Sequence, residues 1–327
     1  MDAFQGLYAE ATLAEQPDAR LYSRAEAVAV LRGSAKGWFF KGFAAFEGDQ
    51  MVGELLVNGS LIDNLRVAKL WVWVPPRFAR RGIGSALAEF GARYCAEQGR
   101  TVLQTELYLG TKAAAPAHGF RRFAERHGYR LVNTMIERRL RLPVDEALLD
   151  RLRDDAAARL DGYRVEVVVG PIPAELAEGY CAVHNRLNLE MPLGEREAEQ
   201  TRRTPEVLAE QDQEIVSAGQ TRVTAFALGD TEVAGFSCGV VSEPDLDYVS
   251  QWATIVDRAH RGHRLGVAVK VALVRSVQQQ FPDKAYLGTI NAQTNEHMIA
   301  INEALGFTVH GVQGEFQRRL PEPTVGG

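Results

Sequence analysis

WVWVPPRFARRGIGSAL (residues 71–87) and ATIVDRAHRGHRLGVAV (residues 253–269) decide the fold of this chain. Each stretch begins as an apolar strand, passes through a short basic segment with glycine, and continues in a helical pattern. The two align with Gly84 opposite Gly266, an offset of 266 − 84 = 182 residues. Similarity at a long, fixed spacing is the signature of an internal repeat.

Two further pairs of segments support the repeat. AFEGDQMVG (45–53) matches AFALGDTEVAG (225–235), and both predict two strands joined at a Gly-Asp turn. ERHGY (125–129) matches EALGF (303–307), at an offset of 306 − 128 = 178 residues. Three landmarks in the same order, with nearly constant offset, predict a tandem duplication of one fold.

Each copy predicts the same order of elements: strand hairpin, long strand, loop, helix, strand, helix and strand. Strand–loop–helix crossovers indicate a mixed α/β fold with a partly parallel sheet. The first long strand is expected at about 65–74. The helical stripes expected to be buried are Leu87, Phe90 and Tyr94 in the first copy and Val267, Val271 and Val274 in the second.

The boundary between the copies is expected near Leu142-Pro143. The predicted organisation is a first domain at 1–143, a helical connector at 144–162 and a second domain at 163–327. The acidic, alanine-rich composition after Pro143 is the reason for expecting a helix there. The first copy shows no clear strand before its helical stretch at 24–31.

Composition narrows the classes of function. A length of 327 residues suits two domains, and the net charge of −5, with scattered Lys and Arg, gives no footprint for nucleic acid. Three distant cysteines without a CxxC pair predict neither a disulfide framework nor a metal site, and they favour a reducing cytoplasm. No apolar run reaches the length of a membrane span. Neither nucleic acid nor a membrane is therefore expected as a partner.

The loops at 79–84 and 261–266 carry the chemistry. The first amides of a helix lack intrahelical partners and, together with the helix dipole, form an anion site. Glycines let a phosphate approach the backbone, and the surrounding basic residues are Arg80, Arg81, Arg261, His263 and Arg264. A tight turn with solvated arginines is the plainer interpretation, but the loop occurs twice. It also follows a long strand without the GxGxxG spacing of a dinucleotide fold or the Lys-Ser/Thr of a P-loop. The free amides, the small residues and the basic residues together predict a pyrophosphate as the ligand.

ARRGIG (79–84) and RGHRLG (261–266) resemble the Arg/Gln-x-x-Gly-x-Gly/Ala signature of the GNAT superfamily of acyl-CoA-dependent N-acyltransferases. The resemblance covers most of the chain in two copies. The chain is especially similar to tandem actinobacterial members, a group that includes mycothiol synthase. Two positions depart from the signature: Ala79 replaces Arg or Gln in the first copy, and Arg264 replaces the first glycine in the second.

The resemblance implies two tandem GNAT folds that bind acetyl-CoA or another acyl-CoA between two splayed strands. The cofactor-binding residues that it implies are Val74, Arg80, Arg81, Gly82, Ile83, Gly84 and Ser85 in the first copy, and Ile255, Val256, Arg261, Gly262, His263, Arg264, Leu265, Gly266, Val267, Asn291 and Asn295 in the second. The alternative for the asparagines is helix capping. Only the second copy has them, so it is expected to be the catalytic one and the first to be degenerate or regulatory.

The family's usual proton-transfer residues are missing. The position of its tyrosine acid holds Ala124 or Asn302, and counting back six residues from the strand ends places Ala68 or Ser250 at the position of its glutamate base. The predicted catalytic residues are therefore Glu190, Asn302 and Tyr248, with Glu190 as the first choice for the base. His184 and Asp247 are further candidates. For any single one of these carboxylates, a solvated surface role is the plainer alternative.

The predicted reaction is direct attack of a primary amine of a small molecule on acetyl-CoA, in a monomer or homodimer. Two alternatives stay open at this point. One is a non-catalytic or regulatory acyl-CoA-binding module. The other is aminoacyl transfer from charged tRNA, against which the lack of a basic patch argues.

Overall fold

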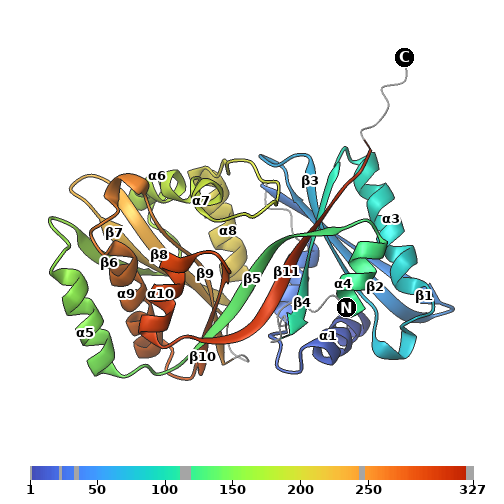
Figure 1. The fold of residues 1–327 in the computed structure, drawn as a ribbon, viewed down its shortest axis with the longest axis horizontal. Helices are drawn as coiled ribbons and strands as arrows, with labels where there is room; N and C mark the ends of the chain where they lie inside the picture. The colour runs from blue at the N-terminus through green and yellow to red at the C-terminus, as the bar shows by residue number, and fades with distance from the viewer. Residues whose placement is uncertain (1, 22–23, 33–36, 111–118, 243–246, 322–327) are drawn as a thin grey trace, which may run out of the picture. The chain divides into compact units, whose positions relative to one another are not determined.

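A computed structural model describes residues 2–21, 24–32, 37–110, 119–242 and 247–321 (Figure 1). The chain forms two compact units of mixed α/β structure, as predicted. Unit 1 contains residues 1–135, 193–199 and 311–327, and unit 2 contains residues 136–192 and 200–310.

Unit 1 opens with helices rather than a strand, in agreement with the missing strand signal. Its sheet follows the order β1, β2, β3, β4, β11 and β5. The elements are α1 (Asp2–Glu15), α2 (Arg24–Arg32), β1 (Trp38–Glu47), β2 (Gln50–Ser60), β3 (Val67–Trp73), a 3-10 turn η1 (Pro76–Phe78), α3 (Ile83–Glu97), β4 (Val102–Gly110), α4 (Gly119–Arg126), the first half of β5 (Arg130–Arg141) and most of β11 (Thr308–Arg319).

Helix α3 covers the unit 1 sheet through a close approach at Gly91. A Cβ at this position would lie 2.7 Å from Leu70 Cδ2 and 3.0 Å from Leu55 Cδ2, so a larger residue would require these leucine side chains to shift. Leu87 is buried as predicted, whereas Phe90 is 39% exposed and packs edge-on against Phe43. The predicted stripe is therefore displaced: the buried residues of α3 are Leu87, Gly91, Ala92 and Cys95.

Unit 2 has the same plan with an additional opening strand. Its sheet follows the order β5, β10, β9, β8, β7 and β6. The elements are α5 (Glu146–Ala157), β6 (Arg164–Val169), α6 (Ala174–His184), α7 (Leu187–Glu190), α8 (Pro205–Ser217), β7 (Gln220–Leu228), β8 (Val233–Ser242), β9 (Tyr248–Val256), η2 (Arg258–His260), α9 (Leu265–Gln280), β10 (Tyr286–Ala292) and α10 (Glu296–Leu305).

Strand β7 shows how the unit 2 sheet is buried on both faces. Val223 and Ala225 belong to a core shared with α5, α9 and α10, whereas Phe226 and Leu228 belong to a core shared with α6 and α8. The predicted α9 stripe of Val267, Val271 and Val274 lies in the first of these cores. Figure 1 shows the two helical layers on opposite faces of the strands.

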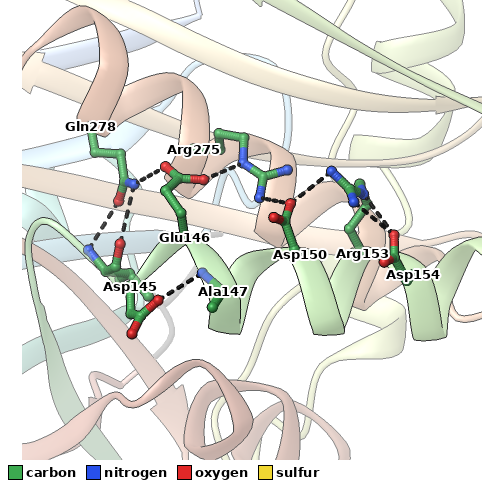
Figure 2. Close-up of polar contacts among 9 residues, drawn as sticks. Asp145, Glu146, Ala147, Asp150, Arg153, Asp154, Arg275 and Gln278 are labelled. Carbon is green, nitrogen blue, oxygen red and sulfur yellow. Dashed lines mark hydrogen bonds and ion pairs between the residues drawn. The ribbon is translucent and has the colours of Figure 1, made fainter.

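The predicted helical connector is a packed part of unit 2. Asp145 caps α5 by accepting a hydrogen bond from the amide of Ala147. Arg275 of α9 donates to Glu146 and to Asp150, at 3.0 and 2.8 Å (Figure 2). Leu149 of α5 is fully buried in the core below. Helix α5 thus packs against α9 as part of unit 2.

The structure also divides the chain differently from the predicted ranges 1–143, 144–162 and 163–327, because strands are exchanged. The final strand of the second copy, β11, pairs antiparallel with β4 of unit 1. The final strand of the first copy, β5, lies beside β10, and its residues 136–141 belong to unit 2. Each copy therefore supplies a strand to the unit built mainly from the other.

Two findings concern other expectations from the sequence. Cys95, Cys181 and Cys238 are buried free thiols. In the part of the chain that the structure describes, no helix has both the length and the apolar character required to cross a bilayer.

Strand exchange can be tested at Phe316, which is fully buried among Leu109 and Ala124 of unit 1. We expect Phe316→Ala to destabilise unit 1 by about 3–5 kcal/mol, because a large aromatic side chain leaves a cavity. Leu273→Ala, in the α9 core, is the matched control for unit 2. Hydrogen exchange resolved by peptide should show increased exchange in β3 and β4 for Phe316→Ala. If Phe316→Ala increased hydrogen exchange only in β9 and β10, the placement of β11 in unit 1 would be wrong.

Candidate functional site

Strands β9 and β10 separate along their length. They are parallel, and their pairing covers only Tyr248–Ser250 and Tyr286–Gly288. In unit 1, β3 and β4 likewise pair only over Val67–Lys69 and Val102–Gln104. The later residues of each strand leave backbone groups facing a gap, where they require water or a ligand as partner.

A bulge marks the point where β9 turns away. Cys238 pairs with Ala253 and Gly239 with Gln251, so Trp252 is an extra residue in β9. Bulges bend a strand and re-aim its side chains. The bulge follows directly after the last residue that pairs with β10, so it accompanies the opening of the gap.

The loop after the long strand has the same backbone conformation in both units. Two positions have positive φ: Arg80 (65°) and Gly82 (85°) in unit 1, and Gly262 (92°) and Arg264 (58°) in unit 2. Each unit thus places one glycine and one arginine at these positions, in opposite order. Arg264 adopts the left-handed conformation of the glycine that it replaces, so the departure from the signature keeps the shape of the loop.

The loop brings the start of α9 to the mouth of the gap. Arg264 caps the helix, and its carbonyl accepts from the amides of Val267 and Ala268 at 3.1 Å each. The amides of Leu265 and Gly266 precede the first intrahelical bonds and can bind an anion. A Cβ on Gly266 would lie 3.2 Å from Ile301 Cδ1, so glycine at this position leaves space between the start of α9 and Ile301 of α10.

A pocket of about 590 Å³ lies at this end of α9. Every residue predicted to bind cofactor in the second copy lines it, except His263 and Asn291. Sequence reasoning missed Leu152 and Arg159, which reach the pocket from the α5 segment, and Met298 and Ile301, which form a wall from α10. These four lacked a motif, and only the packing of α5 and α10 around α9 brings them in.

The cations of the loop have carboxylate partners. Arg261 Nη2 lies 2.5 Å from Glu190 Oε2, and Arg264 Nη2 lies 2.8 Å from Asp155 Oδ2. His263 faces Asp161 at 3.8 Å and lies outside the pocket lining. These ion pairs are partly exposed and therefore weak, so an arriving phosphate can compete for the arginines.

The three residues predicted to be catalytic do not converge. Glu190 lines the pocket and pairs with Arg261. Asn302 is completely buried, and Tyr248 lies at the paired end of β9, its ring over Gly288. About eight residues of strand, some 26 Å, separate Tyr248 from Val256 at the pocket.

The further candidate His184 is buried against Tyr180 and Phe236. Burial, with Arg203 and Arg222 nearby, lowers its pKa to about 3. It does not line the pocket. His184 is thus a neutral core residue under ordinary conditions.

The asparagines have different roles. Asn295 lines the pocket but also caps α10, where its Oδ1 accepts from the amide of Met298 at 3.2 Å. The capping interpretation therefore holds for Asn295. Asn291 and Asn302 hydrogen-bond to each other, with Asn302 Nδ2 donating to Asn291 Oδ1 at 2.7 Å.

Behind the α10 wall lies Lys270, which sequence reasoning missed. Its side chain is 1% exposed, and Nζ donates to Asn302 Oδ1. Burial, with the positive charge of Arg138 nearby, lowers the pKa of Lys270 to about 7. The signal in the sequence was one lysine within the apolar helix VAVKVALV (267–274).

The corresponding pocket in unit 1 is smaller. A pocket of about 110 Å³ lies there, lined by Trp71, Phe123 and Ala124 among others, and by none of the loop residues Arg80–Ser85. In the loop, Arg81 pairs with Glu47 at 2.6 Å, and Ser85 Oγ lies 3.0 Å from His127 Nε2. Val74 lies beside Gly84, and Ile83 lies next to Gly53.

No protein-family model matches the chain, and no curated protein matches it in sequence. Solved structures do. A tandem GNAT protein from the clavulanic acid biosynthesis pathway, in a form without acetyl-CoA, is 25% identical with a TM-score of 0.76, over 97% of this chain and 94% of that one.

Two more distant structures have the same arrangement. A GCN5-related N-acetyltransferase from Sphaerobacter thermophilus is 15% identical with a TM-score of 0.65, over 97% of this chain and 91% of that one. A GCN5-related glucosamine N-acetyltransferase region of a fungal multi-domain GH3 β-N-acetylglucosaminidase is 13% identical with a TM-score of 0.66, over 97% of this chain and 36% of that one. The chain is a tandem GNAT-fold protein, as its sequence resemblance predicts.

The left-handed conformation of Arg264 gives a stability prediction. We expect Arg264→Gly to be more stable than Arg264→Ala by about 1 kcal/mol, because a Cβ is disfavoured at positive φ. Both variants lose the pair with Asp155, so that loss cancels in the comparison. Gly82→Ala should show a similar loss relative to wild type. Urea unfolding measures all three, and an alanine variant as stable as the glycine variant would contradict the loop conformation.

Lys270 gives a pH prediction. Its pKa is about 7 in the folded protein and 10.5 in a solvated lysine, so between these values the unfolded chain binds the extra proton. The free energy of unfolding of wild type should therefore rise with pH in this range relative to Lys270→Met. Urea unfolding at pH 7 and pH 9.5 measures the difference, with the exposed Lys41→Met as control. A difference that stays constant with pH would show that Lys270 is not buried as a titrating group.

Proposed function

We propose that the chain is an acyl-CoA-dependent N-acyltransferase whose unit 2 binds acetyl-CoA and transfers its acetyl group to a primary amine of a small molecule. The observation that carries the proposal is the gap between β9 and β10, which opens directly at the N-terminus of α9. The tandem GNAT fold is consistent with it.

The residues of the pocket fit this cofactor. The pyrophosphate would approach the amides of Leu265 and Gly266, with Arg261 and Arg264 nearby. Arg159, at the same pocket, is a further cation within the lining. The pantetheine arm would lie in the gap, where unpaired strand backbone provides hydrogen-bond partners. A volume of about 590 Å³ lies within the usual range for small-molecule sites.

The reaction itself is simple. The amine nitrogen forms a bond to the thioester carbonyl carbon, the C–S bond breaks, and the amine proton passes to a base while the thiolate leaves. Glu190 is the proposed base, because its carboxylate lines the pocket. Its present partner is Arg261, a residue that a phosphate would also bind. Cofactor binding would then release Glu190 from its ion pair.

A non-catalytic acyl-CoA-binding module is the second candidate. Asn302, at the position of the family's acid, is completely buried, and Tyr248 lies away from the pocket. These placements leave neither of these two predicted residues in position to protonate the leaving thiolate. Release of free thiol separates the two candidates, since only a transferase produces it in the presence of an amine.

The assignment to unit 2 is tested at the matched glycines of the two loops. We expect Gly266→Val to weaken acetyl-CoA binding at least about tenfold, because a branched side chain fills the space at the phosphate-binding amides. Gly84→Val is the control, and it should leave the affinity unchanged. Isothermal titration of acetyl-CoA into both variants and wild type measures this.

Each other outcome has a distinct meaning. Loss of binding in Gly84→Val alone would move the site to unit 1. No saturable heat with wild type would remove the proposal. Where acetyl-CoA binds, a panel of primary amines is assayed for thiol release, and saturable binding without release from any of them would favour the binding module.

A further inference from the structure

Lys270 is buried in an unusual environment. Its Nζ lies 4.0 Å from Met298 Sδ and 4.8 Å from the centre of the Phe307 ring, and it donates to Asn302. Among the described residues, these contacts are an amide, a thioether and a ring, rather than a carboxylate. The nearby charged group is Arg138 of β5, itself buried and close to Glu303. Such burial of a lysine is costly and requires an explanation.

The hydrogen bonds from Lys270 have a fixed direction. A lysine ammonium only donates, so Asn302 must accept through Oδ1 and donate through Nδ2. Asn291 then accepts through Oδ1, at 2.7 Å, and its remaining polar group is an NH2 donor. While Lys270 is protonated, below its pKa of about 7, it therefore determines that Asn291 offers N–H rather than a carbonyl oxygen.

Asn291 lies where this donor is useful. It follows Gly288, the last residue of β10 that pairs with β9, so it belongs to the open part of the gap. Met298 and Ile301 of α10 line the pocket, and Met298 also contacts Lys270. The chain of three side chains thus runs from the core to the edge of the gap.

Unit 1 shows that the fold does not need the hydrogen bonds among Lys270, Asn302 and Asn291. The helix offset of 182 residues places Ala88 at the position of Lys270, and the 178-residue offset places Ala124 at Asn302. The second paired residues of the strands are Leu103 and Leu287, so Leu107 corresponds to Asn291. All three counterparts are apolar and line the small pocket of unit 1. Because the same fold forms with alanine at these positions in unit 1, fold stability alone does not explain a buried lysine and asparagine in unit 2.

We propose that Lys270 is a positioning residue of the acyl-CoA site, which acts through Asn302 to fix Asn291 as an N–H donor to a carbonyl of the acyl-pantetheine arm. This inference rests on the proposed function of unit 2. It identifies the ligand group as an amide or thioester carbonyl, the acceptor that an N–H donor requires.

The test compares two probes in titration calorimetry: acetyl-CoA, and adenosine 3′-phosphate 5′-diphosphate, the nucleotide half of coenzyme A without the arm. At about pH 6, below the Lys270 pKa of about 7, Lys270→Met should weaken acetyl-CoA about tenfold, the value of one neutral hydrogen bond, and leave the nucleotide within about twofold. Asn302→Leu should cause the same loss. The double variant should lose no more acetyl-CoA affinity than either single variant, because both substitutions interrupt the same series of hydrogen bonds.

Val271→Ala is the matched control. It removes buried volume next to Lys270 in α9 and leaves the hydrogen bonds of Lys270, Asn302 and Asn291 in place. The ratio of the acetyl-CoA affinity to the nucleotide affinity should therefore not change. Equal weakening of both probes by Lys270→Met and by Asn302→Leu would show a structural role only and overturn the inference. Wild type that binds the nucleotide as tightly as acetyl-CoA would also overturn it. Wild type that binds neither probe would remove the proposed function itself.

Discussion

The gap between two parallel strands is the constraint on which the rest of unit 2 depends. Backbone groups that leave a ladder inside a protein need other partners. The bulge at Trp252 turns β9 away, the loop places α9 at the mouth of the gap, and α10 and the α5 segment wall it. The elements around the gap therefore serve one purpose: they keep a strand edge open and accessible.

Much of this arrangement was visible in the sequence, because glycines and turns are local signals. The duplication, the loops and the cap of α10 follow from spacing and turn chemistry. The strand exchange does not, since β5 and β11 end equivalent copies and each has the pattern to fit either sheet. Counting back from Val256 also fails, because the extra residue Trp252 shifts the count: Val249, rather than Ser250, matches Ala68.

Arg264 shows a second limit of a signature. Its side chain departs from the family pattern, yet its φ of 58° reproduces the conformation that the pattern needs. Arg80 does the same in unit 1, with φ of 65°. The loop requires positive φ at two positions. Glycine adopts positive φ with the least strain, so a signature written in residue types lists glycine and omits the arginines that adopt the same conformation. Arginine at either position therefore keeps the backbone path that the proposed anion site needs.

The two copies differ in what fills the same place. In unit 1, Ala88, Ala124 and Leu107 line a small pocket, and in unit 2, Lys270, Asn302 and Asn291 at the corresponding positions form directed hydrogen bonds. Apolar residues at these positions allow folding, so the polar set requires another cause. Because a protonated lysine only donates, it orients the amides of Asn302 and Asn291 in turn. The two copies can in this way keep the same fold while only one of them carries directed hydrogen-bond donors at this position.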